Sequence, residues 1–270
     1  MIPDSSVLSI LSILSRANRS IPAGICGFFL AGLLLIPFNL AASATEKPQL
    51  KSQQYVILLH GMARTKDSMS KLENYLVQNS YTVINTGYPS TSLPVEKIAD
   101  DYLAPMVAQC TENGAEKIHI VTHSLGGIVT RQYLQNHSLP EGSRIVMISP
   151  PNKGSELADA FRNWFVYKWL NGPAGQVLGT EPESLPNSLK PVAGEIGVIT
   201  GDSTWNPIYS WLIPGKDDGK VAVESAKLAE MTDFLVVSSS HSFIMRHSEV
   251  LRQVDFFLQN GTFDHTLDIN

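Results

Sequence analysis

Cysteine is scarce in this 270-residue sequence, which contains only Cys26 and Cys110. Cys26 lies in an apolar N-terminal segment, so removal of that segment would leave Cys110 alone and exclude an intramolecular disulfide. Neither a Cys-x-x-Cys nor a His-Glu-x-x-His pattern occurs, and we therefore expect no catalytic metal held by the protein. Cys110 ends an amphipathic helical pattern interrupted by Pro105, and we expect it to be a buried core thiol.

Charged residues are also few, at 17% of the chain, and the formal net charge is only −5. Such a mildly acidic sequence gives no electrostatic basis for nucleic-acid binding. It has no glycine-rich phosphate loop and no dinucleotide-binding fingerprint, so we expect no cofactor. Internal repeats and low-complexity linkers are absent as well, and nothing in the sequence indicates an oligomeric state.

One long run without charge, residues 20–45, follows two arginines. The run ends at Ala42-Ser43-Ala44, an A-x-A cleavage signal, and polar sequence follows it. This pattern predicts a secretory signal peptide over residues 1–44. An uncleaved membrane anchor is the alternative, because the apolar stretch is just long enough to span a bilayer. Pro37 and the small residues at the end of the run favour cleavage, with export to the periplasm or the medium.

We expect the mature protein, residues 45–270, to begin at Thr45 and to have 270 − 44 = 226 residues, which suits a single α/β domain. Terminal sequencing of protein recovered from the periplasm or the medium should read Thr45 first. Recovery of the full-length chain in the membrane fraction would show instead that the segment is an anchor.

Ser124 lies in the sequence Thr122-His123-Ser124-Leu125-Gly126-Gly127, between an apolar β-branched run at residues 118–121 and a helical pattern. A strand, a sharp turn with serine at its tip and a helix together form the setting of a nucleophile elbow. The turn brings the residues two before and two after the serine together, so both must be small. Gly126 meets this requirement, whereas Thr122 replaces the usual glycine, and His123 is expected to order the loop. The alternative is that Ser124 only caps the helix.

A second apolar strand, residues 55–59, ends in His60-Gly61-Met62. Hydrolysis of an ester needs backbone N–H groups that stabilise the oxyanion of the tetrahedral intermediate. The N–H of Leu125 directly follows the serine, and the N–H of Met62 is placed for the second contact. Gly61 would let the backbone approach closely at this point.

A third strand at residues 145–149 runs into Pro150-Pro151-Asn152-Lys153-Gly154-Ser155-Glu156-Leu157-Ala158-Asp159. Together with the elbow and the His-Gly turn, this stretch resembles the α/β-hydrolase superfamily, and within it the bacterial lipases and esterases. These enzymes often carry Pro-His-x-Gly-Ser-x-x-Ala-Asp here, and Asn152 stands where their histidine usually is. The Thr-His-Ser-Leu-Gly-Gly form is also similar to enzymes of the GPI inositol-deacylase type. The resemblance covers roughly residues 54–260 and implies an α/β fold with a mostly parallel, doubly wound sheet and a short cap insertion.

A serine nucleophile needs a histidine base and a carboxylate, and in this fold their chain order is Ser, Asp, His. Three histidines follow Ser124 at a suitable distance: His241, His247 and His265. His241 follows a late strand at residues 234–237, at the end where doubly wound sheets place their chemistry, and is the candidate base. His247 is the reserve, expected one or two turns inside the next helix, and His265 lies in a polar tail.

The candidates for the carboxylate are Asp202, Asp217, Asp218 and Asp233. Asp202 directly follows a predicted strand at residues 196–200, so its position favours it. Asp218-Gly219-Lys220-Val221, however, looks like the Asp-Gly-x-Val turn that carries the acid in many lipases. We rank Asp218 first, Asp202 second and Asp217 third. The alternative is that the Asp-Gly pair is only a solvated loop tip.

Between about residues 160 and 194 the alternation of strands and helices breaks, and aromatic side chains crowd together. An insert after the strand at residues 145–149 is where this fold keeps its cap. We expect Trp164, Phe165 and Trp169 to contribute to an acyl-binding wall. The alternative is that these aromatic residues serve only in packing.

These expectations describe an exported serine hydrolase that cleaves carboxylic esters through an acyl-enzyme. Its substrate would be an acyl ester or a lipid, and a lipid substrate would bring it into transient contact with a membrane surface. Alternatives within the same fold are a thioesterase or an acyltransferase. An alternative of another class is a non-catalytic homologue that binds a lipid or a protein, against which the complete set of triad residues argues.

Overall fold

The computed structural model describes residues 53–204 and 207–266. The predicted signal peptide, residues 1–44, and its cleavage site lie outside the described residues. Within the described part of the chain, no helix combines the length and the apolar character needed to cross a membrane.

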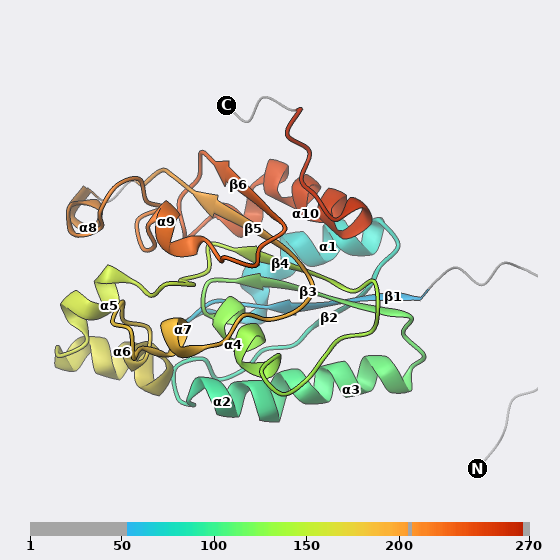
Figure 1. Ribbon diagram of the computed structural model, residues 1–270, viewed down its shortest axis with the longest axis horizontal. Helices are drawn as coiled ribbons and strands as arrows, with labels where there is room; N and C mark the ends of the chain where they lie inside the picture. The colour runs from blue at the N-terminus through green and yellow to red at the C-terminus, as the bar shows by residue number, and fades with distance from the viewer. Residues whose placement is uncertain (1–52, 205–206, 267–270) are drawn as a thin grey trace, which may run out of the picture. The chain divides into compact units, whose positions relative to one another are not determined.

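Six parallel strands form one sheet in the order β2-β1-β3-β4-β5-β6 (Figure 1). Their bounds are β1 Gln54–Leu59, β2 Thr82–Asn85, β3 Lys117–His123, β4 Arg144–Ile148, β5 Glu195–Gly201 and β6 Asp233–Val237. The central strands are buried on both faces, which is why they are nearly continuous apolar runs and do not alternate with polar residues. The predicted strands and the doubly wound parallel sheet are therefore confirmed.

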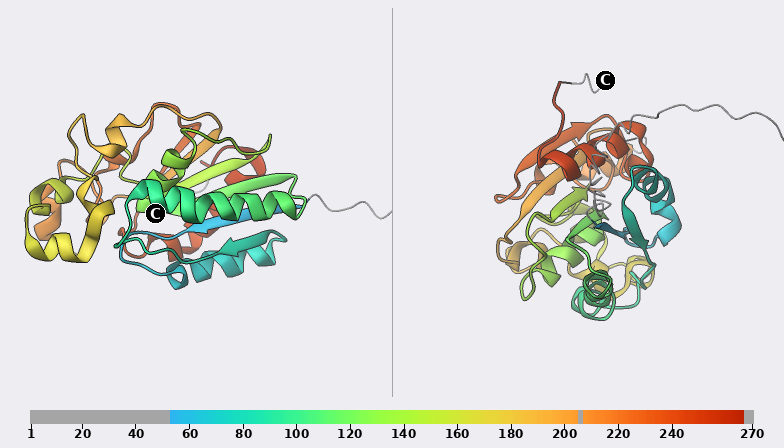
Figure 2. Two further views of the ribbon diagram at one scale, coloured as in Figure 1. Left: turned by 90° about the horizontal axis from the view of Figure 1, so that it is seen from below. Right: turned by 90° about the vertical axis from the view of Figure 1, so that its right-hand side faces the viewer.

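Helices cover both faces of the sheet (Figures 1 and 2). The bounds of the five main covering helices are α1 Ser70–Gln78, α2 Val95–Ile98, α3 Ala104–Glu112, α4 Leu125–Tyr133 and α10 Ser248–Asn260. Successive residues of a strand point to opposite faces. Ile120 thus belongs to the core shared with α2, α3 and α4, whereas Val121 belongs to the core shared with α1 and α10. The two apolar layers therefore hold the sheet between them.

The helix that ends near Cys110 departs from α geometry where the sequence places Pro105. A π-helical turn, η2 (Ala99–Leu103), joins α2 to α3 directly before this proline. Proline has no N–H to donate to the carbonyl one turn earlier, and a wider turn accommodates it. Cys110 is fully buried, and burial raises the pKa of its thiol to about 11. The thiol is therefore protonated and is part of the core.

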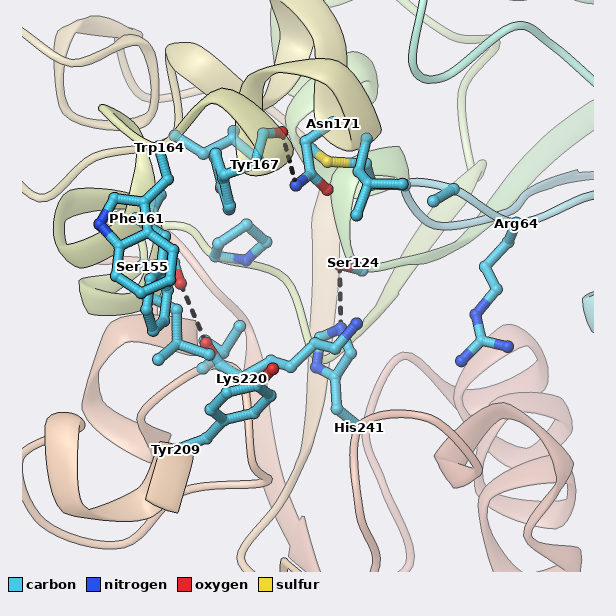
Figure 3. Close-up of a pocket in the computed structure, with 18 of the residues that line it drawn as sticks. Arg64, Ser124, Ser155, Phe161, Trp164, Tyr167, Asn171, Tyr209, Lys220 and His241 are labelled. Atoms are coloured by element: carbon cyan, nitrogen blue, oxygen red, sulfur yellow. Dashed lines mark hydrogen bonds between the residues drawn. The ribbon is translucent and has the colours of Figure 1, made fainter. Parts of the chain in front are cut away.

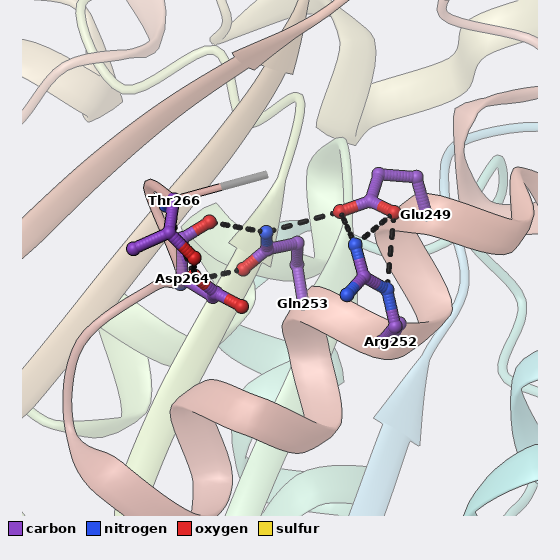
Figure 4. Close-up of polar contacts among 5 residues, drawn as sticks. All are labelled: Glu249, Arg252, Gln253, Asp264 and Thr266. Carbon is purple, nitrogen blue, oxygen red and sulfur yellow. Dashed lines mark hydrogen bonds and ion pairs between the residues drawn. The ribbon is translucent and has the colours of Figure 1, made fainter. Parts of the chain in front are cut away.

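A polar cluster fastens the C-terminal segment to α10 (Figure 4). Buried Gln253 donates to the Asp264 carbonyl at 2.8 Å and accepts from the Asp264 N–H at 2.9 Å. Glu249 accepts a further bond from Gln253 and pairs with Arg252. In the same segment, His265 pairs with Asp233 at the first residue of β6. This pair lies at the amino end of β6, away from the loop that carries His241.

The segment between β4 and β5 contains the helices α5 (Glu156–Phe161), α6 (Phe165–Gln176) and α7 (Leu185–Ser188). α6 is broken at Gly172, whose φ is 56° and where any side chain would collide with the Thr91 carbonyl. A further helix, α8 (Pro207–Leu212), comes from the segment between β5 and β6 and contacts α5. The sequence analysis did not predict α8. Two separate insertions, one between β4 and β5 and one between β5 and β6, therefore cover this end of the sheet.

Candidate active site

Ser124 occupies the sharp turn between β3 and α4. Its φ of 54° and ψ of −120° are strained for a residue with a side chain. Gly126 makes the turn feasible, because a Cβ there would lie 2.8 Å from the Leu59 carbonyl oxygen and 3.2 Å from the Thr122 Cβ. Thr122 can replace the usual glycine because Gly126 leaves the space that its side chain needs.

The topology brings the turn after β1 beside this elbow. β1 and β3 are neighbours in the sheet, with Leu59 opposite Thr122, although the chain visits β2 between them. The strand order reverses at this point, and doubly wound sheets bind ligands in the crevice at such a reversal. The loop that begins at His60 and the serine at the tip of the elbow therefore share one edge of the sheet.

Side chains from three separate loops form a continuous line of hydrogen bonds. His241 Nε2 lies 3.0 Å from Ser124 Oγ (Figure 3), and His241 Nδ1 lies 2.8 Å from Asp218 Oδ2. Asp218 lies between β5 and β6, and His241 follows β6. The backbone joins their two loops, since the His241 N–H donates to the Asp218 carbonyl at 2.8 Å. The structure thus brings together the three residues that the sequence analysis ranked first.

The Asp218 carboxylate is fixed by its own turn. The N–H groups of Lys220 and Val221 donate to Asp218 Oδ1 at 3.0 and 2.9 Å, and Gly219 at the tip of the turn has a φ of 93°. Burial acts to raise the pKa of Asp218, but His241 and hydrogen bonds that include the one from the Val221 N–H outweigh burial and hold the pKa below its usual value. The carboxylate is therefore ionised at neutral pH and can stabilise a positive charge on His241.

The other acid and histidine candidates have different partners. Asp202 pairs with Lys216 at 2.9 Å. Asp217 accepts the Gly219 N–H at 2.7 Å and the hydroxyl of Ser210. His247 immediately precedes α10 and does not lie one or two turns inside it, because the 3₁₀ turn η3 (Ile244–Arg246) delays the start of the helix.

Tyr88 holds the loop that carries the Met62 N–H. The Tyr88 N–H donates to His60 Nε2 at 3.2 Å, so His60 carries its proton on Nδ1, which donates to the Gly61 carbonyl at 2.8 Å. The Tyr88 hydroxyl donates to the His60 carbonyl, and the two rings stack with their centres 4.1 Å apart. Burial lowers the pKa of His60, which keeps this ring neutral. The role of Tyr88 was not evident from the sequence.

His123 connects this loop to the loop of His241. Its Nε2–H donates to the His241 carbonyl at 3.0 Å. Its Nδ1 lies so close to Gly61 that a Cβ on that residue would be 2.7 Å away. Burial, and then the charge on His241, lower the pKa of His123 well below its usual value, so the ring is neutral. His123 therefore orders the loop, as the sequence analysis expected.

A cavity of about 450 Å³ opens beside Ser124 and His241 (Figure 3). Its volume lies within the range of small-molecule sites. The apolar part of its wall comes largely from the two insertions, which contribute Leu157, Ala158, Phe161, Trp164, Val166, Tyr167, Leu170, Leu178 and Tyr209 among others. Such a wall suits a hydrocarbon chain.

Of the three aromatic residues expected to bind substrate, only Trp164 lines this cavity. Phe165 and Trp169 are 81% and 73% exposed and lie outside it. The helical period of α6 explains the difference. Val166, Tyr167, Leu170 and Asn171 lie on the side of the helix that faces the cavity, whereas Phe165 and Trp169 do not.

The wall residues that the sequence analysis missed include Tyr209 of α8, Arg64 and Lys220. Arg64 lies in the loop after β1, and Lys220 was considered only as part of the turn around Asp218. Their side chains meet at the cavity only because the sheet brings the loops after β1 and β5 to the same edge.

Asn152 is buried away from the cavity wall and donates to the Ala226 carbonyl at 2.8 Å. Arg131 in turn donates to the Asn152 carbonyl at 3.0 Å. Asn152 therefore supports the turn after β4. Among the residues described by the structure, no group of three or more His, Cys, Asp or Glu side chains could hold a metal ion.

The family model for the alpha/beta hydrolase fold matches residues 54–181. The structure is similar to the mature lipase BlEst2 of Bacillus licheniformis, with a TM-score of 0.59 and 18% identity over 81% of this chain and 95% of that one. It is also similar to the phospholipase PlaB from Legionella pneumophila, with a TM-score of 0.59 and 19% identity over 78% of this chain and 60% of that one. A metagenomic carboxyl esterase, MGS0156, matches with a TM-score of 0.50 and 16% identity over 72% of this chain and 66% of that one. No curated protein matches the sequence.

Proposed function

We propose that this chain, which belongs to the α/β-hydrolase superfamily, is a serine hydrolase that cleaves carboxylic esters. The observation that carries the proposal is the line of hydrogen bonds from Ser124 through His241 to Asp218, beside a cavity with an apolar wall. Serine is a weak nucleophile at neutral pH, and this arrangement supplies the base and the orienting carboxylate that activate it.

In the first half of the reaction, Ser124 Oγ attacks the ester carbonyl carbon while its proton passes to His241 Nε2. Asp218 stabilises the resulting imidazolium from the Nδ1 side. The carbonyl oxygen becomes an oxyanion and accepts hydrogen bonds from the backbone N–H groups of Met62 and Leu125. The C–O bond to the alcohol then breaks, the alcohol takes the proton from His241, and the acyl group stays on Ser124.

In the second half, a water molecule gives a proton to His241 Nε2 and attacks the acyl-enzyme carbonyl. The second tetrahedral intermediate uses the same two N–H groups. When it collapses, Ser124 recovers its proton from His241 and the carboxylic acid leaves. The ester and one water molecule thus yield an acid and an alcohol, with no external cofactor.

The preferred esters would carry an acyl chain, and a membrane or another lipid surface would supply them. The apolar cavity wall supports this assignment, as do the lipase and phospholipase among the similar structures. A second support is a set of exposed apolar side chains around the cavity, which we name the apolar rim: Trp164, Phe165, Val166, Trp169, Leu170, Ile208 and Trp211. The rim residues lie in α6 and α8, except for Trp164, which directly precedes α6. Exposed apolar patches of this kind mark surfaces that contact lipid or another protein.

Catalysis is tested by incubating the mature protein with p-nitrophenyl esters of graded chain length and with a fluorophosphonate probe. We expect hydrolysis of acyl esters and one covalent adduct on the peptide that contains Ser124. Absence of both would show that the chain is a non-catalytic binder. A higher rate of acyl transfer to an added alcohol or thioester cleavage in preference to ester cleavage would favour an acyltransferase or a thioesterase.

Replacing rim residues should weaken hydrolysis at a lipid surface more than hydrolysis in solution. Each large side chain that enters the lipid contributes about 1.5–3 kcal/mol. Phe165→Ser and Trp169→Ser should therefore each lower activity on an ester embedded in vesicles by about tenfold or more. Activity on a short, soluble ester should change much less, because neither side chain lines the cavity.

The matched control is Val77→Ser, which removes an exposed apolar side chain from α1, outside the rim. It should leave vesicle activity close to that of the wild type. Equal losses on both substrates in the rim variants would assign Phe165 and Trp169 to cap stability and not to lipid contact.

A further inference from the structure

Two positive side chains line the cavity, Arg64 and Lys220, and no Asp or Glu is among the described residues that form its wall. This contrasts with the whole chain, whose formal net charge is −5. Among the ion pairs of the described residues, none involves Arg64 or Lys220. The cavity is therefore a positive site in an acidic protein.

The two cations lie close enough to affect each other and the catalytic loops. Desolvation lowers the pKa of Lys220, the nearby Arg64 guanidinium lowers it further, and Asp218 acts to raise it. Both cations also act to lower the pKa of His123, directly before the nucleophile. The Asp218 carboxylate is already engaged by His241 and two backbone N–H groups. Two like charges held together are unfavourable until an anion binds near both of them.

The arrangement around Ser124 separates these charges from most of the apolar wall (Figure 3). In this view Phe161 and Trp164 lie on one side of Ser124 and Arg64 lies on the other, while the Lys220 side chain extends beside His241. An ester bound to Ser124 with its acyl chain along the aromatic side would direct its alcohol portion toward the cations. Guanidinium and ammonium groups bind phosphate oxygens through charge-assisted hydrogen bonds.

We propose that Arg64 and Lys220 form an anion subsite that selects acyl esters whose alcohol portion carries a phosphate group, as in an acylated glycerophosphate. This inference rests on the proposed esterase function and specifies its substrate class. Arg64 would take two phosphate oxygens through its planar fork, and Lys220 would bind as a point charge nearer the catalytic histidine. The shared chemistry is that of a phosphate anion, which a lipid head group or free phosphate could supply.

The test compares two esters with the same acyl chain, 1-octanoylglycerol and 1-octanoylglycerol 3-phosphate, both dissolved as monomers. We expect kcat/KM of the wild type to be about tenfold or more higher for the phosphate ester, as for a charge-assisted contact. Arg64→Gln and Lys220→Gln should each lower the ratio of the two kcat/KM values, and the double variant should bring it close to one. Arg64→Lys should keep part of the preference, because it retains the charge but loses the fork.

Lys66→Gln is the matched control, since Lys66 is exposed, lies two residues from Arg64 and does not line the cavity. It should leave the ratio at its wild-type value. An equal fall of the ratio in this control would overturn the subsite, because the preference would then come from the general field of the protein. A wild-type ratio near one would overturn it as well.

A second arm uses inorganic phosphate as an inhibitor of 1-octanoylglycerol hydrolysis. Arg64-dependent inhibition by phosphate without any preference for the phosphate ester would show that the site takes the free anion, and would overturn the assignment of substrate. Hydrolysis of neutral 1-octanoylglycerol reports on the proposed function alone. Retained neutral hydrolysis without a preference overturns only the subsite, whereas loss of both reactions overturns the esterase proposal.

Discussion

Ser124→Ala is expected to lower kcat for a soluble acyl ester on the order of a million-fold and to abolish fluorophosphonate labelling. Without Oγ there is no atom for His241 to deprotonate and no atom to hold the acyl group. The backbone N–H groups of Met62 and Leu125 would remain, so only the small residual catalysis of an oxyanion hole is expected. Rates with the soluble ester and the adduct mass of the labelled protein provide the two measurements.

The fold of this variant should be preserved. Alanine keeps the Cβ of serine, and among the described residues Ser124 Oγ is hydrogen-bonded to His241 Nε2 alone. The unfolding temperature should therefore stay close to that of the wild type. Ser155→Ala is the matched control, because Ser155 lines the same cavity but its hydroxyl donates to the Lys220 carbonyl. Near wild-type activity in Ser124→Ala, or a probe adduct on Ser155, would contradict the mechanism.

The strands of the sheet were predictable because a short run of residues in the sequence specifies each of them. Residues 55–59, 118–121 and 145–148 are short, mainly apolar and β-branched runs of the kind found in strands buried on both faces, and they lie in the observed strands β1, β3 and β4. The elbow was equally local, since strand, serine and glycine follow one another in the chain. His241 and Asp218 could be ranked because the carboxyl ends of parallel strands meet at one edge.

The covering helices were less predictable, because their positions depend on contacts with distant segments. α8 has no buried residue to give it a sequence pattern, yet it contributes Tyr209 to the cavity. The orientation of Phe165 and Trp169 depends on where α6 begins, and residue types alone do not specify this. Arg64 and Lys220 lie in loops that follow two different strands, so no motif in the sequence predicts that they line the same cavity.

Asp218→Asn is expected to lower kcat by about ten thousand-fold. The reason is that the two carboxylate oxygens of Asp218 have different partners: Oδ1 accepts backbone N–H groups, and Oδ2 lies beside His241 Nδ1. Oδ1 accepts the N–H groups of Lys220 and Val221, so the amide oxygen of the variant would occupy that end. Its NH₂ group would then face His241 Nδ1, which would have to become an acceptor. His241 would carry its proton on Nε2 and could no longer accept the proton of Ser124.

Asp202→Asn and Asp217→Asn are the matched comparisons, because each makes the same chemical change at one of the other two ranked positions. Asp202 pairs with the exposed Lys216, and Asp217 bonds the Gly219 N–H and Ser210, so both variants should retain most of their activity.

Raising the pH should not rescue Asp218→Asn. The pKa of the Asp218 carboxyl lies below its usual value, so the wild-type group is already ionised at neutral pH, and the variant has no acid to ionise. The three variants should be measured side by side on one soluble ester. If Asp202→Asn lost the most activity and Asp218→Asn stayed active, direct succession to a strand would be a better guide to the acid than the Asp-Gly-x-Val turn, and the hydrogen bond between Asp218 and His241 would have a structural role only.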